Sequence, residues 1–131
     1  MQVPGYLENQ DALKAAGIDE VLIYCVNDGA VMKAWAQDQG IEGSMISFMG
    51  DPYSTVTRAL DMEMDHPGPK SVGIFNRCKR FALYLVDGVV KVVRISEKPD
   101  DPAGDEFPEV SIYYVFGLCI LTYNTILTCI H

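Results

Sequence analysis

The residues best suited to chemistry are one cysteine and the cations around it. Cys78 lies between Arg77 and Lys79, and Arg80 follows them. On an extended strand Cys78 and Arg80 would share one face, with Arg77 and Lys79 on the other. Neighbouring cations favour the thiolate, which is the nucleophilic form of cysteine. Cys78 is therefore the best candidate for a reactive thiol, although spacing alone favours a surface cysteine of ordinary reactivity.

The other thiols show no metal or redox motif. The sequence contains four cysteines, and the remaining three are Cys25, Cys119 and Cys129. Their spacing matches neither a zinc site nor a C-x-x-C pair. Neither His66 nor His131 stands at ligand spacing from a cysteine or carboxylate, so we predict no metal and no cofactor. No hydrophobic N-terminal run suggests a signal peptide, so we expect free thiols in a reducing, cytoplasmic compartment, with an organelle as the alternative.

The chain is acidic, and this limits the partners that it can bind. It has 131 residues, of which 49% are apolar, and a net charge of -8. This length and composition predict one packed domain. An acidic chain repels phosphate backbones and anionic lipids, so we exclude nucleic acid and expect no membrane partner. Asp61, Glu63 and Asp65 lack the glycine and closing glutamate of a calcium loop, which predicts a solvated acidic face.

The first forty residues alternate between helical and strand patterns. Pro4 near the start and Gly17 at the end bracket a predicted helix over 4–16. The continuous apolar run 21–26 is typical of a strand buried on both faces of a parallel sheet. Asn27-Asp28 then supplies an N-cap for a second predicted helix over 29–38.

The alternation continues to an antiparallel hairpin. A second apolar run, 45–48, predicts a strand, and Ser54 can cap a short helix through Asp61. We expect a loop over 65–69. The strands 80–86 and 89–95 are joined by Asp87-Gly88, the strongest hairpin signal in the chain. The pattern predicts an α/β fold, a three-layer sandwich with a mixed sheet of the thioredoxin-like kind.

The last twenty residues differ from the rest of the chain. Residues 112–130 carry no charge and are rich in apolar side chains, and their length would just span a bilayer. Three interpretations stay open: a tail anchor, a buried or partner-seeking element, and sequence from an altered reading frame or retained intron. We expect a domain over 1–111 and a divergent apolar tail over 112–131.

Three sequence blocks carry a resemblance to the type II, peroxiredoxin-5-like peroxiredoxins, and it extends from Val3 to about Ser111. The blocks are Val3-Pro4-Gly5-Tyr6 with 13–20, Val26-Asn27-Asp28 with 31–35, and 77–82 leading to 87–90. The family-motif positions among them are Pro4, Gly5, Asn27, Asp28, Trp35 and Arg77.

The resemblance implies a chemistry and its partners. The family reduces hydrogen peroxide and alkyl hydroperoxides, with thioredoxin or glutaredoxin as the reductant. Its active-site arginine precedes an aromatic residue, a position that matches Arg80 before Phe81. A fixed guanidinium lowers a thiol pKa and stabilises the leaving oxygen. The resemblance also implies a homodimer, with Trp35 in the core or at the subunit interface.

The catalytic cysteine of the family has no counterpart in these residues. The motif P-x-x-x-T-x-x-C, which precedes Pro-Gly-Tyr in the family, is absent, and Gln2 replaces the usual histidine. The position of the plant resolving cysteine is Ile23, and Cys25 is expected in the core. We therefore expect no peroxidase activity from this chain by itself. The alternative function is that of a decoy subunit that pairs with a full-length peroxiredoxin.

The resemblance also implies that a central strand is missing, between strands 21–26 and 80–86. Each unpaired buried backbone group costs about 1–3 kcal/mol, against a total stability of about 5–15 kcal/mol. Four outcomes are open: the two edges close up, the apolar tail fills the slot, another chain supplies a strand, or the chain folds poorly.

Overall fold

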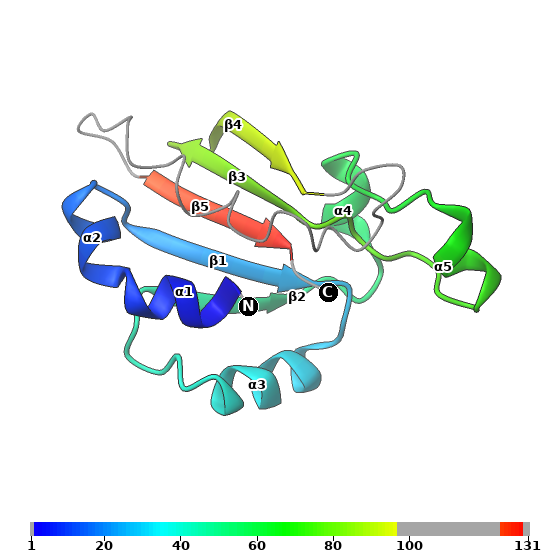
Figure 1. Ribbon diagram of the computed structural model, residues 1–131, viewed down its shortest axis with the longest axis horizontal. Coiled ribbons are helices and arrows are strands. Elements are labelled where there is room, and N and C mark those ends of the chain that lie inside the picture. Colours follow the sequence, from blue (N-terminus) through cyan, green and yellow to red (C-terminus); the bar gives the residue numbers. More distant parts are fainter. Residues whose placement is uncertain (1, 97–123, 130–131) are drawn as a thin grey trace.

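A mixed five-stranded sheet forms the centre of the computed structural model, which describes residues 2–96 and 124–129 (Figure 1). The strand order is β2-β1-β5-β3-β4. β1 is parallel to β2 and β5, whereas β3 is antiparallel to β5 and β4. The strands are β1 (Glu20–Cys25), β2 (Ile46–Gly50), β3 (Phe81–Val86), β4 (Val89–Ile95) and β5 (Asn124–Cys129).

Helices connect the strands and contribute to both faces of the sheet. α1 and α2 lie beside β1, and α3 links β1 to β2 (Figure 1). α4 and α5 follow β2 and precede β3. The helices are α1 (Gln2–Glu8), α2 (Gln10–Ala15), α3 (Gly29–Asp38), α4 (Thr55–Ala59) and α5 (Pro67–Ser71). The predicted α/β class with a mixed sheet is confirmed.

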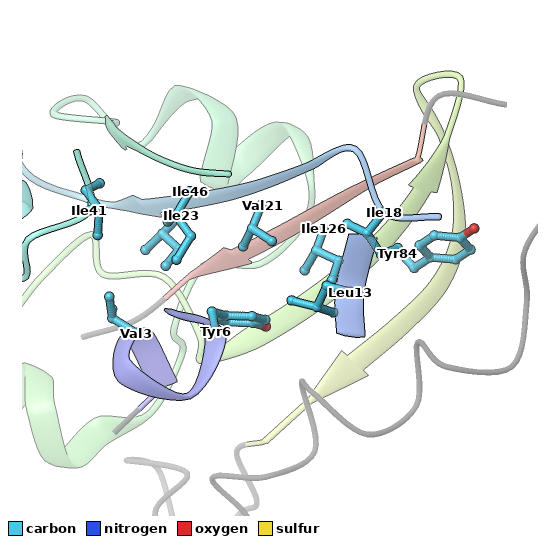
Figure 2. Packing of buried hydrophobic residues seen from close by; sticks show 10 residues of the cluster. All are labelled: Val3, Tyr6, Leu13, Ile18, Val21, Ile23, Ile41, Ile46, Tyr84 and Ile126. Carbon is cyan, nitrogen blue, oxygen red and sulfur yellow. The ribbon is translucent and has the colours of Figure 1, made fainter. Parts of the chain in front are cut away.

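The larger hydrophobic cluster lies between α1, α2 and one face of the sheet (Figure 2). Tyr6 of α1 and Leu13 of α2 are fully buried there, against Ile23 of β1 and Ile126 of β5. Alternate strand residues point to opposite faces, so the next residue of β1, Tyr24, contributes to a second cluster on the other face. The second cluster consists of Tyr24, Met62, Cys78, Phe81, Leu83 and Cys129.

Several local predictions are confirmed because their signals are local. β1 and α3 match the predicted ranges within one residue, and the Asp28 side chain caps α3 as expected. Asp87 and Gly88 adopt left-handed backbone angles, with φ of 49° and 76°, in the tight turn between β3 and β4. Asp and Gly are the residues that such a turn favours.

The predicted bounds of one helix and of one loop are wrong. The helix expected over 4–16 is divided at Asn9, whose side-chain Nδ2 donates to the Gly5 carbonyl at 2.8 Å. Asparagine commonly competes for backbone partners in this way. Part of the loop expected over 65–69 is the short helix α5, where His66 Nδ1 accepts a hydrogen bond from the Gly68 N–H at 3.0 Å.

The tail fills the slot between β1 and β3, at least over 124–129. β5 pairs with β1 on one side and with β3 on the other, so neither of these strands is left with an open edge there. This is one of the four expected outcomes. A membrane anchor through 124–129 is excluded by the sheet pairing, and residues 112–123 lie outside the described part. Within that part, no helix is long and apolar enough to cross a membrane.

Candidate redox site

The carboxyl ends of the parallel strands lie at one edge of the sheet, and the thiols are found there. Cys25 ends β1 and Cys129 ends β5. Antiparallel β3 begins at the same edge, because Phe81 is paired with Cys129, and Cys129 with Tyr24. Ligand and catalytic sites of α/β sheets commonly lie at this edge.

A disulfide joins Cys78 to Cys129 at this edge. Their Cα atoms are 6.7 Å apart, within the range that a disulfide spans, and they are 51 residues apart in the sequence. Both residues are buried, with exposed fractions of 1% and 0%. The expectation of free thiols is therefore wrong for this pair, and Cys78 is not a surface cysteine. The long sequence separation left no local signal for the pairing.

Cys25 does not take part in this disulfide, and it is buried. The prediction that Cys25 is a small core residue is confirmed. Cys119 lies outside the described residues. Of the three described cysteines, two form the disulfide and the third is buried, so none of them exposes a thiol to solvent.

Apolar and aromatic side chains surround the disulfide. The rings of Tyr24 and Phe81 meet edge to face, with centroids 5.9 Å apart, and Met62 packs in the same cluster. Burial raises the pKa of Tyr24, and the nearby charge of Asp51 acts in the same direction, whereas a hydrogen bond with Thr57 opposes them. Tyr24 is therefore a neutral phenol, and the sulfur atoms lie in a water-poor environment.

The carboxylate of Asp51, the residue that follows β2 at this edge, is buried. Asp51 accepts hydrogen bonds from the backbone N–H of Thr55, Val56 and Thr57, at 2.7, 3.2 and 2.9 Å, and from Thr57 Oγ1 at 2.9 Å. Burial alone would raise the pKa of Asp51, but these hydrogen bonds together lower it. Asp51 rather than Ser54 therefore caps α4, because Ser54 Oγ donates instead to the Asn76 carbonyl at 2.7 Å.

Arg80 precedes β3 at this edge and is half-buried, as are Arg77 and Lys79. Two backbone contacts fix the segment that precedes β3. The Lys79 N–H donates to the Met62 carbonyl at 2.8 Å, and Glu63 and Cys78 form an antiparallel bridge. Arg80 and Cys78 thus belong to one segment beside the end of β5. The catalytic role of Arg80 stays a prediction.

The other motif residues have scaffold positions. Asp28 Oδ1 accepts from the N–H groups of Ala30 and Val31 at 2.9 Å each, and this starts α3. A Cβ atom on Gly50 would lie 2.5 Å from the Asn27 carbonyl, so the turn fits closely against the end of β2. The remaining motif residues are Pro4 and Gly5 in α1, and Trp35, half-buried, whose ring lies 4.4 Å from that of Phe48.

The acidic residues after α4 are dispersed. Glu63 lies 4.0 Å from the Arg58 guanidinium, and Asp65 pairs with Lys70. In the part of the chain that the structure describes, no group of three or more histidine, cysteine, aspartate or glutamate side chains could hold a metal ion.

Comparison with known proteins identifies the family to which this chain belongs. The Redoxin family matches residues 1–114. The chain is a peroxiredoxin of the Redoxin family. It is 38% identical over 95 residues to the chloroplastic Peroxiredoxin-2E-2 of Oryza sativa subsp. japonica, and 41% identical over 95 residues to Peroxiredoxin-2C of the same organism. These alignments cover 72% of this chain but 42% and 56% of the relatives, so the chain spans about half their length.

Solved peroxiredoxin structures show the same partial coverage. Reduced Prx3 of Vibrio vulnificus has a TM-score of 0.63 at 38% identity, over 75% of this chain and 59% of that one. Peroxiredoxin 5 of Alvinella pompejana has a TM-score of 0.63 at 30% identity, over 76% of this chain and 60% of that one. The thioredoxin-like fold predicted for this peroxiredoxin is therefore confirmed.

Proposed function

We propose that these 131 residues hold the scaffold and the guanidinium of a hydroperoxide-reducing peroxiredoxin but do not turn over peroxide by themselves. The observation that carries the proposal is the state of the described thiols, of which two are bonded and one is buried. Peroxide reduction of this type needs a thiolate that attacks the peroxide oxygen beside a cation. Arg80 is the cation that we assign to that chemistry.

The reaction class fixes the substrate and the reductant to be tested. A thiolate attacks one oxygen of a hydroperoxide, an alcohol or water leaves, and the resulting sulfenic acid is returned to the thiol by a dithiol reductant. Thioredoxin or glutaredoxin is the reductant class that we propose, in a cytoplasmic setting. Two relatives in plants are named as chloroplastic and mitochondrial proteins, so an organelle is the alternative compartment.

A coupled peroxidase assay tests the proposal. The purified chain is given hydrogen peroxide or tert-butyl hydroperoxide, with either thioredoxin and NADPH-dependent thioredoxin reductase, or glutaredoxin, glutathione and NADPH-dependent glutathione reductase. We expect NADPH consumption no faster than with a variant in which all four cysteines are replaced by alanine. Turnover that disappears in Cys78→Ser, or in Cys119→Ser, would contradict the proposal and identify the nucleophile.

Pairing with a full-length peroxiredoxin or with a second copy is the second candidate function. The observation that favours it is a set of exposed apolar side chains on the connections between β2 and β3. Tyr53, Val72 and Phe75 are 80%, 73% and 61% exposed. Exposed apolar side chains that gather into a patch commonly mark an interaction surface.

Light scattering with size-exclusion chromatography tests this pairing. We expect a mass above that of one chain, alone or after mixing with a full-length type II peroxiredoxin, and a return to monomer mass in Phe75→Ser. A monomer under both conditions would exclude it. Val89→Ser, on an exposed position of β4 outside these connections, is the matched control.

A further inference from the structure

The last strand of the chain occupies the centre of the sheet. β5 has ladder partners along both sides, from Glu20 to Tyr24 on β1 and from Phe81 to Val86 on β3. Its side chains are also held, because Ile126 is fully buried and Thr128 Oγ1 donates to the Phe81 carbonyl at 2.8 Å. Departure of β5 would therefore expose two strand edges and part of both hydrophobic clusters.

One covalent bond connects this strand to its neighbour at the end where the described chain stops. Cys129 is the last residue of β5, and Cys78 lies three residues before β3. The bond closes a loop between residues 51 positions apart, so it greatly limits how far β5 can move from β3. Without the bond, the contacts described for this end of β5 are noncovalent: ladder hydrogen bonds, the Thr128 hydrogen bond to Phe81 and packing.

The burial of both sulfur atoms couples their chemistry to the position of β5. Cys78 and Cys129 pack in one cluster with Tyr24, Met62 and Phe81, and they have almost no solvent exposure. A reagent in water can reach them only when this end of the sheet opens, and the two thiols meet only when β5 is docked. Bond formation therefore depends on docking, and it then stabilises the docked state.

We propose that Cys78 and Cys129 form a redox latch that controls whether β5 occupies the sheet. In the oxidised form the disulfide keeps β5 between β1 and β3. In the reduced form β5 leaves the sheet more often and exposes both strand edges. This role is separate from peroxide turnover and does not depend on the proposed function.

The redox step balances with a disulfide oxidant of the glutathione class. One thiolate of the pair attacks oxidised glutathione and releases one glutathione thiolate, which leaves a mixed disulfide. The second thiolate then attacks the protein sulfur of that mixed disulfide and releases the second glutathione thiolate. Two protein thiols are oxidised by two electrons, and one glutathione disulfide is reduced. A dithiol reductant carries out the reverse step.

Hydrogen exchange of the full chain tests the latch. The same protein is measured by mass spectrometry after equilibration with oxidised glutathione and after treatment with dithiothreitol, with the Cys78–Cys129 linkage verified by peptide mapping. In the reduced protein we expect exchange at 124–129 to rise by about tenfold or more, with a parallel rise in 20–25 and 81–86. Unchanged exchange of β5 in the two redox states would overturn the proposal, as would failure of the linkage to form.

Two alanine variants separate the latch from general effects of reduction. Cys78→Ala should exchange at β5 as fast as the reduced protein, and dithiothreitol should change it no further. Cys25→Ala removes the neighbouring buried thiol at the end of β1 and should keep the full redox response. A redox response that survives in Cys78→Ala would overturn the proposal, and so would its loss in Cys25→Ala. If either variant fails to fold, the comparison of the two redox states of the unmodified chain still decides.

Discussion

β4 and β5 show opposite relations between sequence signal and burial. β4 follows a strong hairpin signal, yet its side chains are mostly exposed, with Val89 at 55% and Val93 at 42%. β5 comes from the apolar tail, for which the sequence left three interpretations open, yet its Ile126 and Cys129 are completely buried. Local signals thus decide that a strand forms, whereas the edges available for pairing decide how deeply it is buried.

The position of each strand in the sheet explains the difference. Among the described strands, β4 lies at the edge of the sheet and pairs only with β3, and it carries Lys91 and Arg94, which are typical of protected edges. β5 pairs on both sides and contributes to both hydrophobic clusters. A substitution in β5 should therefore lower the free energy of unfolding much more than a substitution in β4.

The largest contrast is expected from a charge placed on each strand. Ile126→Asp puts a carboxylate into a fully buried position, and we expect it to lower the free energy of unfolding by more than about 4 kcal/mol. Val93→Asp on β4 should cost about 1 kcal/mol or less. Urea unfolding followed by circular dichroism measures both. Equal losses would mean that β5 does not occupy the centre of the sheet in solution.

A milder pair keeps this comparison measurable if Ile126→Asp does not fold. Ile126→Val removes one buried methylene and should cost about 1 kcal/mol. Val93→Ala on the exposed edge should cost less than that. The reverse order would contradict the assignment of β5 to the core.

The next largest effect is expected from the covalent bond at the end of β5. For a sequence separation of 51 residues, loss of the disulfide should lower the free energy of unfolding by about 4 kcal/mol. Urea unfolding with and without dithiothreitol measures this difference. Cys25→Ala should show the same difference between the two conditions, whereas Cys78→Ala should show none. An unchanged midpoint in the unmodified chain would mean that the bond does not form in solution.

A smaller, pH-dependent effect is expected from Asp51, which is linked to Tyr24 through Thr57. Asp51→Asn should cost about 1–2 kcal/mol at neutral pH, because it weakens the cap of α4. The folded-state pKa of Asp51 lies below its ordinary value of 3.8, so the contribution is complete above that value. It is lost as the pH falls through the folded-state pKa.

The pH dependence is checked by urea unfolding at pH 7 and at low pH. The difference between Asp51→Asn and the unmodified chain should shrink at low pH, where the Asp51 carboxylate is protonated. A difference between Asp51→Asn and the unmodified chain that stays constant at all pH values would contradict the role of the carboxylate charge.

The smallest effect is expected on the β4 side. Asp87→Asn should lower the free energy of unfolding by less than about 0.5 kcal/mol, because asparagine also suits the left-handed turn.

The elements predicted most accurately are those with short-range signals. The apolar run of β1, the Asp28 cap and the Asp87-Gly88 turn each lie within a few residues, and the structure contains all three. The wrong predictions involve competition that spacing does not reveal. Ser54 has the right position for a cap, but its hydroxyl donates to Asn76, and Asp51 takes its place.

The sequence by itself determined the peroxiredoxin family, the α/β class and the segment that carries Arg80, because these depend on motifs and on hydrophobic patterns. Only the tertiary structure decided that 124–129 fills the centre of the sheet and that Cys78 pairs with Cys129. A strand takes the place where unpaired edges and an apolar slot are open to it, and two thiols bond only where the fold brings them together. Both conditions belong to residues far apart in the sequence, so no local pattern contains them.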